Sequence, residues 1–387
     1  MFPDASALQG LSLPRRGFSP AGRVTAALAA FLSPAGRVTA VLTAFLSPPW
    51  RVAAVLAALL LTACSGGKTP LVVYSPHGNY LLGLFERQFE AAHPDVDVRW
   101  LDMGSQEVLD RLRAERANPQ ADVWFGGPST IFARGARDSL LEPFRPSWAA
   151  ATDSAGWGPG DLYFAAYQTP AVIIYAREAV SAEQAPQDWD DLLDPRWQGK
   201  VLIRDPLASG TMRAVWGMII ERELRRTGDT AAGFAWLRRL DANTREYVLN
   251  GPILNQKLVR QEGLVSVWDL PDVRLAMRDG LQLAYVFPRS GSPVIPDAIG
   301  VVRGARHREL ARQFVEFIGT VDAQLAAARE VARLPVRRDL PAAQVPDWVR
   351  ETRARMQVAD VDWAMLEQHG AEWMQYWDRN VRGKGAQ

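Results

Sequence analysis

After residue 70, apolar residues occur in two alternating patterns, short continuous runs and a spacing of three or four residues. Residues 71–74 form a short apolar run that ends in Ser-Pro-His-Gly, and apolar positions within 81–89 then recur every three or four residues. The same alternation is repeated at 96–100, 108–112 and 121–125. Short apolar runs are typical of strands, and the three- and four-residue spacing is typical of helices. The pattern therefore predicts the strand–helix alternation of an open α/β sheet.

The middle of the chain carries further β-type runs, and helical spacing dominates its last part. These later strands are predicted at 163–167, 171–175, 201–204, 265–268, 283–287 and 298–302. The run 310–318 begins the helical part. A length of 387 residues fits two such domains followed by a tail.

The first 63 residues do not follow this pattern and are predicted to be a signal region. Arg51 precedes an apolar run that ends in Leu-Thr-Ala-Cys64, which is the layout of a secretory signal peptide. A 14-residue unit that starts at Ser19 recurs at Ser33 and, degraded, at Ser47. We interpret these copies as a duplicated signal stretch or a start site assigned too early, and exclude residues 1–63 from the fold.

The end of this segment resembles the bacterial lipoprotein signal. In that family the cysteine receives lipid and becomes the mature N-terminus, which implies a lipid on Cys64, a membrane anchor and a flexible tether over 64–69. The chain would then be exported to the periplasm or the outer cell surface. The alternative is a buried helix with a chance cysteine, but the run is short for a bilayer span.

Composition narrows the function classes. Lys plus Arg is 44 and Asp plus Glu is 43, a balance that gives no reason to expect a nucleic-acid partner. The single cysteine excludes an intramolecular disulfide and a cysteine-rich zinc site. No Gly-x-Ser-x-Gly, His-Glu-x-x-His or phosphate-loop motif occurs, and there are only four histidines. A binding protein is therefore favoured over an enzyme.

From about residue 70 to residue 338, the chain resembles periplasmic solute-binding proteins of the ferric-iron and phosphonate type, in the type II class. The resemblance is carried by 71–75, 121–125, 189–200, 209–211, 285–288 and 298–305. It implies two α/β lobes, each a mixed open sheet flanked by helices, that close on a ligand by hinge motion.

The same resemblance implies the domain boundaries and partners. Lobe 1 is expected at 70–167 plus 293–387, with the C-terminal helices, and lobe 2 at 168–292. Crossovers are expected near 167–171 and 287–294. The expected partners are a small-molecule ligand and an ABC permease, and the protein is expected to be a monomer. A sensor built on the same fold would have the same binding site.

Ligand residues are expected in loops that follow strands, because open α/β sheets bind ligands beyond the carboxyl ends of their strands. Three of these loops lead into helices, whose free N–H groups suit an anion. As an alternative, Ser and Thr at helix starts serve only as N-caps. Arg204 could bind an anion or pair with Asp205. The candidates are Ser75, His77, Ser129, Thr130, Ser209, Gly210, Thr211, Trp268 and Asp269.

The candidate loops differ from those of the ferric-binding members that they resemble. Those members carry paired tyrosines in the fourth loop and commonly a Glu in the second, since iron(III) prefers anionic oxygen ligands. Here the fourth loop reads Val-Trp268-Asp269-Leu, and the second has no Glu. We therefore expect no cofactor and favour an oxyanion such as an organic phosphate, phosphonate or carboxylate over iron. Asp269 would bind an amine or sugar hydroxyl of the same ligand.

Overall fold

The computed structural model describes residues 67–385. The predicted signal region 1–63, Cys64 and part of the 64–69 tether lie outside the described residues, so the signal region, the lipid anchor and the tether stay predictions. Within 67–385, no helix is both long and apolar enough to cross a membrane.

The first sheet combines strands from the first third of the described chain with one from much later in the sequence. Strands β1, β2 and β3 run parallel, and β10 lies antiparallel between β3 and β5. Apolar side chains form separate cores on the two faces of this sheet. This lobe 1 comprises β1 (Thr69–Ser75), α4 (Gly78–Ala92), β2 (Val96–Asp102), α5 (Ser105–Ala114), β3 (Val123–Pro128), α6 (Ser129–Arg137), β4 (Leu141–Glu142), β10 (Val294–Val302), α11 (Arg308–Ile318), α12 (Val321–Val331), β11 (Leu334–Pro335) and α13 (Asp347–Arg355).

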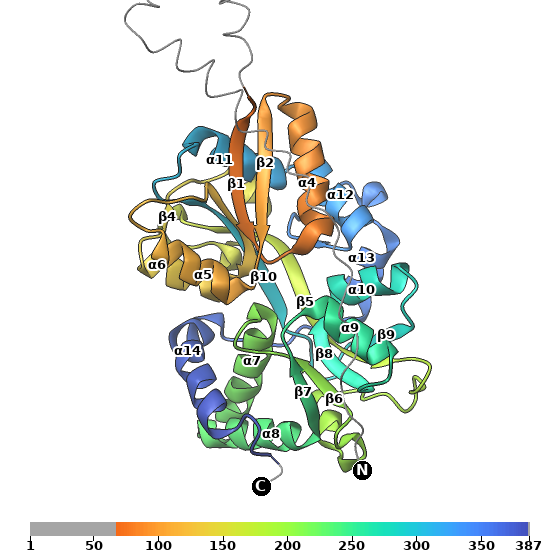
Figure 1. Cartoon of the computed structure of the whole chain (residues 1–387). Coiled ribbons are helices and arrows are strands. Elements are labelled where there is room, and N and C mark those ends of the chain that lie inside the picture. Colours follow the sequence, from red (N-terminus) through yellow and green to blue (C-terminus); the bar gives the residue numbers. More distant parts are fainter. Residues whose placement is uncertain (1–66, 386–387) are drawn as a thin grey trace, which may run out of the picture. The chain divides into compact units, whose positions relative to one another are not determined.

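The second sheet is built from the middle of the chain. Strand β6 is parallel to its neighbours β7 and β8, and β8 and β9 each pair antiparallel with β5. Figure 1 shows this sheet below the first, with its own helices around it. This lobe 2 comprises β6 (Val201–Arg204), α7 (Gly210–Thr227), α8 (Thr230–Asn243), β7 (Thr244–Val248), α9 (Gly251–Val259), β8 (Val265–Asp269), α10 (Leu270–Arg278) and β9 (Leu283–Val286).

Strand β5 (Phe164–Ala176) belongs to both sheets. Its first half, through Pro170, pairs with β10, and its second half, from Ala171, pairs with β8 and β9. Twelve of its 13 residues are buried, since helices and neighbouring strands cover it in both lobes. The change of sheet falls inside the stretch 167–171, and the link 287–293 between β9 and β10 makes a second passage. The mixed sheets flanked by helices confirm the predicted fold class.

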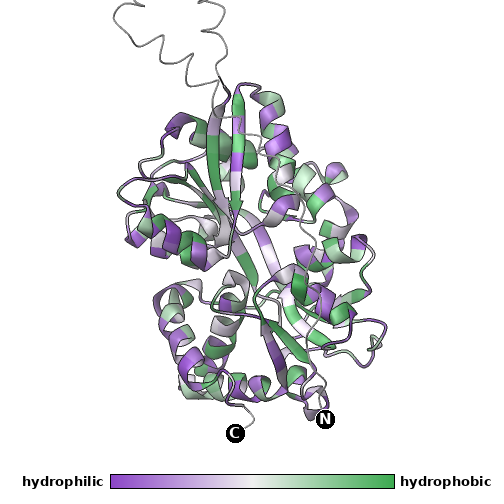
Figure 2. Cartoon of the chain, viewed as in Figure 1, coloured by the Kyte–Doolittle hydropathy of each residue, from purple (hydrophilic) through white to green (hydrophobic). Residues whose placement is uncertain are grey.

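Hydropathy follows this architecture. In Figure 2 the hydrophobic residues concentrate on the strands of both sheets, while the helices alternate between hydrophobic and hydrophilic positions. The alternation arises because each helix turns one apolar stripe toward a sheet and leaves the other face to water. Helix α11 is an example, with Ala311, Phe314, Val315 and Ile318 buried.

The last helix, α14 (Trp363–Asn380), departs from the expected boundaries. The C-terminal helices were expected on lobe 1, and α13 does pack there through Val349. Helix α14 instead joins the core of lobe 2 through Trp373 and Trp377, and keeps a contact with lobe 1 through the ion pair of Glu367 with Arg137 of α6. The reason is a close fit on α7: a Cβ on Gly217 would lie 2.7 Å from Cγ of Leu366, so the glycine lets the two helices approach. The chain thus crosses between the lobes a third time.

Candidate functional site

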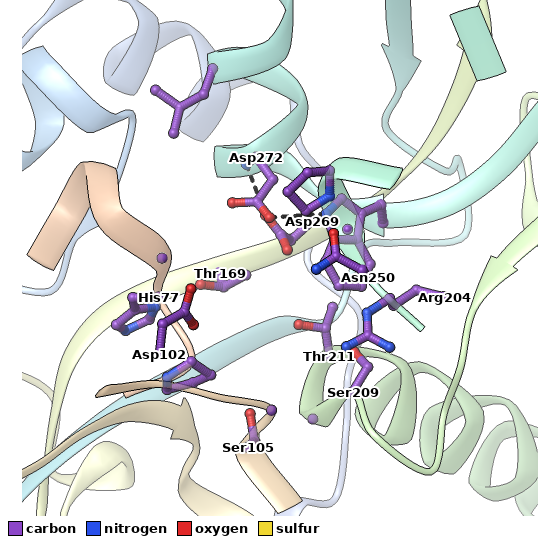
Figure 3. Close-up of a pocket in the computed structure, with 18 of the residues that line it drawn as sticks. His77, Asp102, Ser105, Thr169, Arg204, Ser209, Thr211, Asn250, Asp269 and Asp272 are labelled. Atoms are coloured by element: carbon purple, nitrogen blue, oxygen red, sulfur yellow. Dashed lines mark hydrogen bonds between the residues drawn. The ribbon is translucent and has the colours of Figure 1, made fainter. Parts of the chain in front are cut away.

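A cavity of about 800 Å³ lies between residues of both lobes. The loops after β1, β2, β6 and β8 contribute to its wall, so it sits beyond the carboxyl ends of strands, where the α/β rule expects a ligand. Figure 3 shows polar side chains from these loops pointing into the space.

Six of the nine predicted ligand residues line this cavity. They come from three loops that are distant in the sequence, so the fold brings them together as the strand-end rule predicts. The six are His77, Ser209, Gly210, Thr211, Trp268 and Asp269. Their contact with a ligand stays a prediction.

The other three predicted residues do not line the cavity. Ser75 is fully buried, and its Oγ accepts a hydrogen bond from the backbone N–H of His77 at 3.2 Å, which is a structural role. Ser129 and Thr130 begin α6, but β3 extends as far as Pro128 and carries the chain past the cavity before the helix begins. Only Gly127 and Pro128 of that loop reach the wall.

At one end of the cavity, the starts of α5 and α7 converge from opposite lobes. A Cβ on Gly210 would lie 2.4 Å from Cδ of Pro128 and 3.0 Å from Oγ of Ser105. A Cβ on Gly104 would lie 3.1 Å from the carbonyl oxygen of Ala208. Both glycines are therefore needed for the close approach, which points two helix N-termini at one space.

Hydrogen-bond donors remain free at this convergence. The Ser209 Oγ caps α7 by accepting from the Met212 N–H at 3.2 Å, while the N–H groups of Gly210 and Thr211 have no acceptor among residues 67–385. At the start of α5, Gly104 offers no capping side chain, so first-turn amides are left open there too. Such free amides at a helix N-terminus make an anion site.

Arg204 faces the same space. It is 9 % exposed and forms no ion pair within the described chain; its one hydrogen bond there, to the Val248 carbonyl oxygen, is long at 3.4 Å. The alternative partner, Asp205, pairs with Arg382 at 2.6 Å instead. Burial lowers the pKa of Arg204, yet an arginine stays protonated in proteins. Figure 3 shows its guanidinium beside Ser209 and Thr211.

The other end of the cavity is acidic. Asp269 is 5 % exposed and caps α10 by accepting from the Asp272 N–H at 2.9 Å through Oδ1. Its Oδ2 accepts no hydrogen bond from the described residues. Asp272 accepts from the Trp268 indole N–H at 3.1 Å. Asp102, at the end of β2 in lobe 1, lines the wall of the same cavity.

The acidic end of the cavity also contains the buried Arg333 and, on the hinge strand β10, Asp297. Asp297 on β10 accepts a hydrogen bond from the Thr169 hydroxyl on β5. Arg333, only 4 % exposed, places its guanidinium 3.7 Å from Asp272, and its Nε has no partner in the described chain. Burial raises the pKa of Asp297 to about 6, against the opposing effects of Thr169 and Arg333.

The histidine of the first loop carries no charge. Burial, aided by the positive charge of Arg333, lowers the pKa of His77 well below 6.5. Its ring packs edge-on against Phe125, with centroids 5.0 Å apart. His77 is therefore neutral at pH 7 and adds no positive charge to the cavity.

Several cavity residues were missed from the sequence. Asp102 ends β2 and Ser105 follows it, and the rule applied to the other strand ends could have found them. Asp272 lies three residues after a predicted site residue, within one helical turn. Asp297 and Arg333 carry no such signal, because they reach the cavity only through the hinge strands β10 and β11.

Comparison with known proteins places the chain among binding components of transporters. The family model for bacterial extracellular solute-binding proteins matches residues 87–356. A probable ABC transporter periplasmic-binding protein of Sinorhizobium fredii is 27% identical over 318 residues, or 81% of this chain and 86% of that protein. A putative 2-aminoethylphosphonate-binding periplasmic protein of Salmonella typhimurium is 28% identical over 292 residues, 73% of this chain and 83% of that protein.

Solved structures share the fold. The periplasmic binding protein AfuA from Actinobacillus pleuropneumoniae, with exogenous fructose-6-phosphate bound, aligns with a TM-score of 0.70 at 24% identity, covering 82% of this chain and 100% of that one. Iron-bound HitA from Pseudomonas aeruginosa aligns with a TM-score of 0.67 at 18% identity, covering 79% and 98%. Two-lobed binding proteins thus match the fold, and the family model covers most of the described chain. The chain belongs to the bacterial extracellular solute-binding proteins, the substrate-binding components of ABC transporters.

Proposed function

We propose that this protein captures a small organic phosphate or phosphonate between its lobes and delivers it to an ABC permease without chemical turnover. The observation that carries the proposal is Arg204, a buried guanidinium with no acidic partner in the described chain, beside the convergent starts of α5 and α7. Burying an unpaired charge is costly, so a ligand anion would compensate it.

The donor set suits a tetrahedral oxyanion. A guanidinium binds two oxygens of one phosphate or phosphonate at once. The Thr211 hydroxyl and the free amides at the two helix starts offer donors to the remaining oxygens. Because α5 belongs to lobe 1 and α7 to lobe 2, an anion held by both would stabilise the closed arrangement.

Relatives of the chain support phosphonates and phosphates, and also raise iron as an alternative cargo. The names of relatives refer to 2-aminoethylphosphonate and to iron uptake. Among residues 67–385, no three His, Cys, Asp or Glu side chains are arranged to hold a metal ion. With Trp268 and Asp269 where ferric binders of this type carry tyrosines, the organic anion remains the favoured cargo and no cofactor is invoked.

We further propose that the protein is lipid-anchored through Cys64 after export, with 64–69 as the tether. The Leu-Thr-Ala-Cys64 motif supports this proposal. Intact-mass measurement of the protein purified from membranes should show a chain that begins at Cys64 with added lipid mass. The Cys64→Ser variant should lose that mass and leave the membrane fraction. A membrane-bound protein that keeps residues 1–63 would contradict the anchor.

The ligand proposal is tested by calorimetric titration with 2-aminoethylphosphonate, fructose-6-phosphate and ferric citrate. One of the two phosphorus-containing compounds should bind stoichiometrically without being consumed. The Arg204→Met variant should bind it about 10- to 100-fold more weakly, because charge-assisted hydrogen bonds are lost. The control is Arg226→Met, which alters an exposed arginine near the end of α7. Tight iron binding with no response to either phosphorus compound would contradict the proposal.

A further inference from the structure

The cavity carries more negative charge than an anion site alone would have. The carboxylates in its wall are those of Asp102, Glu107, Asp269, Asp272, Asp279 and Asp297, whereas the guanidiniums are those of Arg204 and Arg333 only. His77 is neutral and adds nothing. Asp279 pairs with Arg278, and burial raises the pKa of Asp269 and Asp297, yet acidic groups still outnumber basic ones in the wall. This excess opposes the binding of a simple anion, since like charges repel across a weakly screened cavity.

Three of these carboxylates lie at the starts of α4 and α10, although Glu107 is in the first turn of α5 and the charge of Asp272 is felt at Arg204. Figure 3 shows Asp269 and Asp272 at the start of α10 on one side of the cavity and Asp102 on the other. The first two belong to lobe 2 and Asp102 to lobe 1. Helices α4 and α10 therefore already have carboxylates at their N-termini: Asp102 beside Gly78, and Asp269 as the cap of α10. Helix α7 has no acidic residue in its first turn, and α5 has Glu107 there.

Two buried groups of the cavity wall lack partners. Asp269 is only 5 % exposed, and its Oδ2 accepts no hydrogen bond from residues 67–385. The Oδ1 of Asn255, a buried residue of the cavity wall on α9, also has no partner in the described chain. Both are acceptors. Unpaired buried acceptors call for a donor from the ligand.

We propose that the ligand is a zwitterion whose ammonium group binds between Asp102 of lobe 1 and Asp269 and Asp272 of lobe 2, while its phosphonate or phosphate binds at Arg204 and the starts of α5 and α7. The proposal rests on the proposed function for the anionic end. It names the second half of the ligand, a primary amine, and assigns it to carboxylates contributed by both lobes.

A neutral hydroxyl fits this end less well. A hydroxyl would satisfy an acceptor but would leave Arg333, 3.7 Å from Asp272, as the one cation of the described cavity wall beside the carboxylates of the two lobes. An ammonium group donates three hydrogen bonds and cancels charge on both sides. A cation in contact with carboxylates of both lobes would hold the lobes together and so contribute to closure as well as to affinity.

The protonation of these carboxylates is consistent with the proposal. Burial raises the pKa of Asp269 well above its ordinary value, with Asp272 adding to the effect. Partial burial likewise raises the pKa of Asp102, with the charges of Asp272 and Glu107 contributing. A bound ammonium would lower these pKa values, so binding near pH 6 should release protons from the protein.

The test compares two ligands that share a phosphonate and have the same number of heavy atoms. In 2-aminoethylphosphonate an ammonium ends the chain, and in propylphosphonate a methyl group takes its place. Calorimetry in two buffers of different ionisation enthalpy measures affinity and the protons released by the protein, after subtracting the ligand's own ionisation. The amine should bind at least 10-fold more tightly and release protons at pH 6. Equal affinities, or proton uptake with the amine, would overturn the inference.

Variants then locate the subsite. Asp269→Asn keeps the Oδ1 cap of α10, and both it and Asp102→Asn should reduce amine affinity about 10- to 100-fold while leaving propylphosphonate affinity unchanged or improved. The control is Asp110→Asn, an exposed residue that pairs with Arg113 on α5. Melting curves identify any loss of folding. Unchanged preference for the amine in Asp102→Asn would refute the bridging role.

Failure of this inference can be told apart from failure of the proposed function. If both phosphonates bind equally and Arg204→Met weakens both, the anion site stands and the ammonium site does not. If neither phosphonate nor fructose-6-phosphate binds, the proposed function itself fails.

Discussion

The two ends of the cavity use the same structural element for opposite purposes. At one end, α5 and α7 present free amides and hydroxyls, and a buried arginine stands beside them. At the other end, α4 and α10 also point their N-termini at the cavity, but aspartates already occupy them. A helix N-terminus therefore does not identify an anion site by itself. The side chain placed next to it decides which charge the ligand brings.

The largest expected effect comes from obstructing the anion end. The Gly210→Val variant would place a branched side chain where even a Cβ lies 2.4 Å from Pro128. We expect ligand affinity to fall more than about 100-fold, because overpacked side chains force the helix starts apart. The clash lies between lobes, so the melting temperature should change little. Calorimetry and thermal melts on one preparation check both, and retained affinity would show that the helix starts need not approach.

Removing hydroxyls at the anion end should have a smaller effect. The Ser209→Ala plus Thr211→Ala variant loses neutral donors but keeps Arg204 and the backbone amides. We expect a loss of affinity of about 10-fold, at roughly 1 kcal/mol per hydrogen bond. Loss of the Ser209 cap should also lower stability by about 1 kcal/mol. The matched control is Ser181→Ala plus Thr227→Ala in lobe 2. An unchanged affinity would assign the anion to Arg204 and the amides alone.

At the acidic end, stability without ligand should depend on pH through Asp297. Its pKa is about 6 when folded and 3.8 ordinarily, so the folded state holds the proton more tightly. Stability from this group is present below pH 4 and is lost as the pH rises through 6, by up to about 3 kcal/mol. The difference in unfolding free energy between wild type and Asp297→Asn should therefore change between pH 4 and pH 7. A constant difference would contradict the raised pKa.

The smallest effect is expected from breaking the ion pair between Arg382 and Asp205, which lies behind the anion end of the cavity. Arg382, just after α14, pairs with Asp205 at 2.6 Å, and Asp205 accepts from the Leu207 N–H at 2.8 Å. The Arg382→Ala variant should leave Asp205 buried and unpaired, lowering stability by about 1–3 kcal/mol and affinity a few-fold. Arg382→Lys, which retains the charge, should recover part of both. Loss of stability with unchanged affinity would limit Arg382 to a structural role.

Local patterns were sufficient for the fold and for part of the site. Alternating apolar runs predicted the α/β sheets, and strand ends identified Ser209, Thr211 and Asp269, because both features depend on neighbours in the sequence. Ser129, predicted as a ligand residue, does not line the cavity, and nothing local shows that β3 runs on to Pro128. Arg333 escaped prediction because its position depends on the pairing of β11 with β5, more than 150 residues away.

The placement of α14 was missed for a similar reason. The spacing of Trp373 and Trp377 predicted an amphipathic helix, but two lobes offered apolar surfaces to receive it. Gly217 of α7 makes the close fit on lobe 2 possible, because its missing side chain admits Leu366. A residue that acts by leaving space has no signature in the hydrophobic pattern.

The position of β10 between β3 and β5 has a consequence for the order in which the chain acquires structure. The strands unique to lobe 2 all lie between residues 201 and 286, so that sheet can form from neighbouring segments. In lobe 1, β3 pairs with a strand that begins at residue 294, so its edge stays open until that segment arrives. Pairing over such a distance is slow, and an open edge invites association with other chains. During synthesis and export, the part of the protein made first is therefore among the last to be completed.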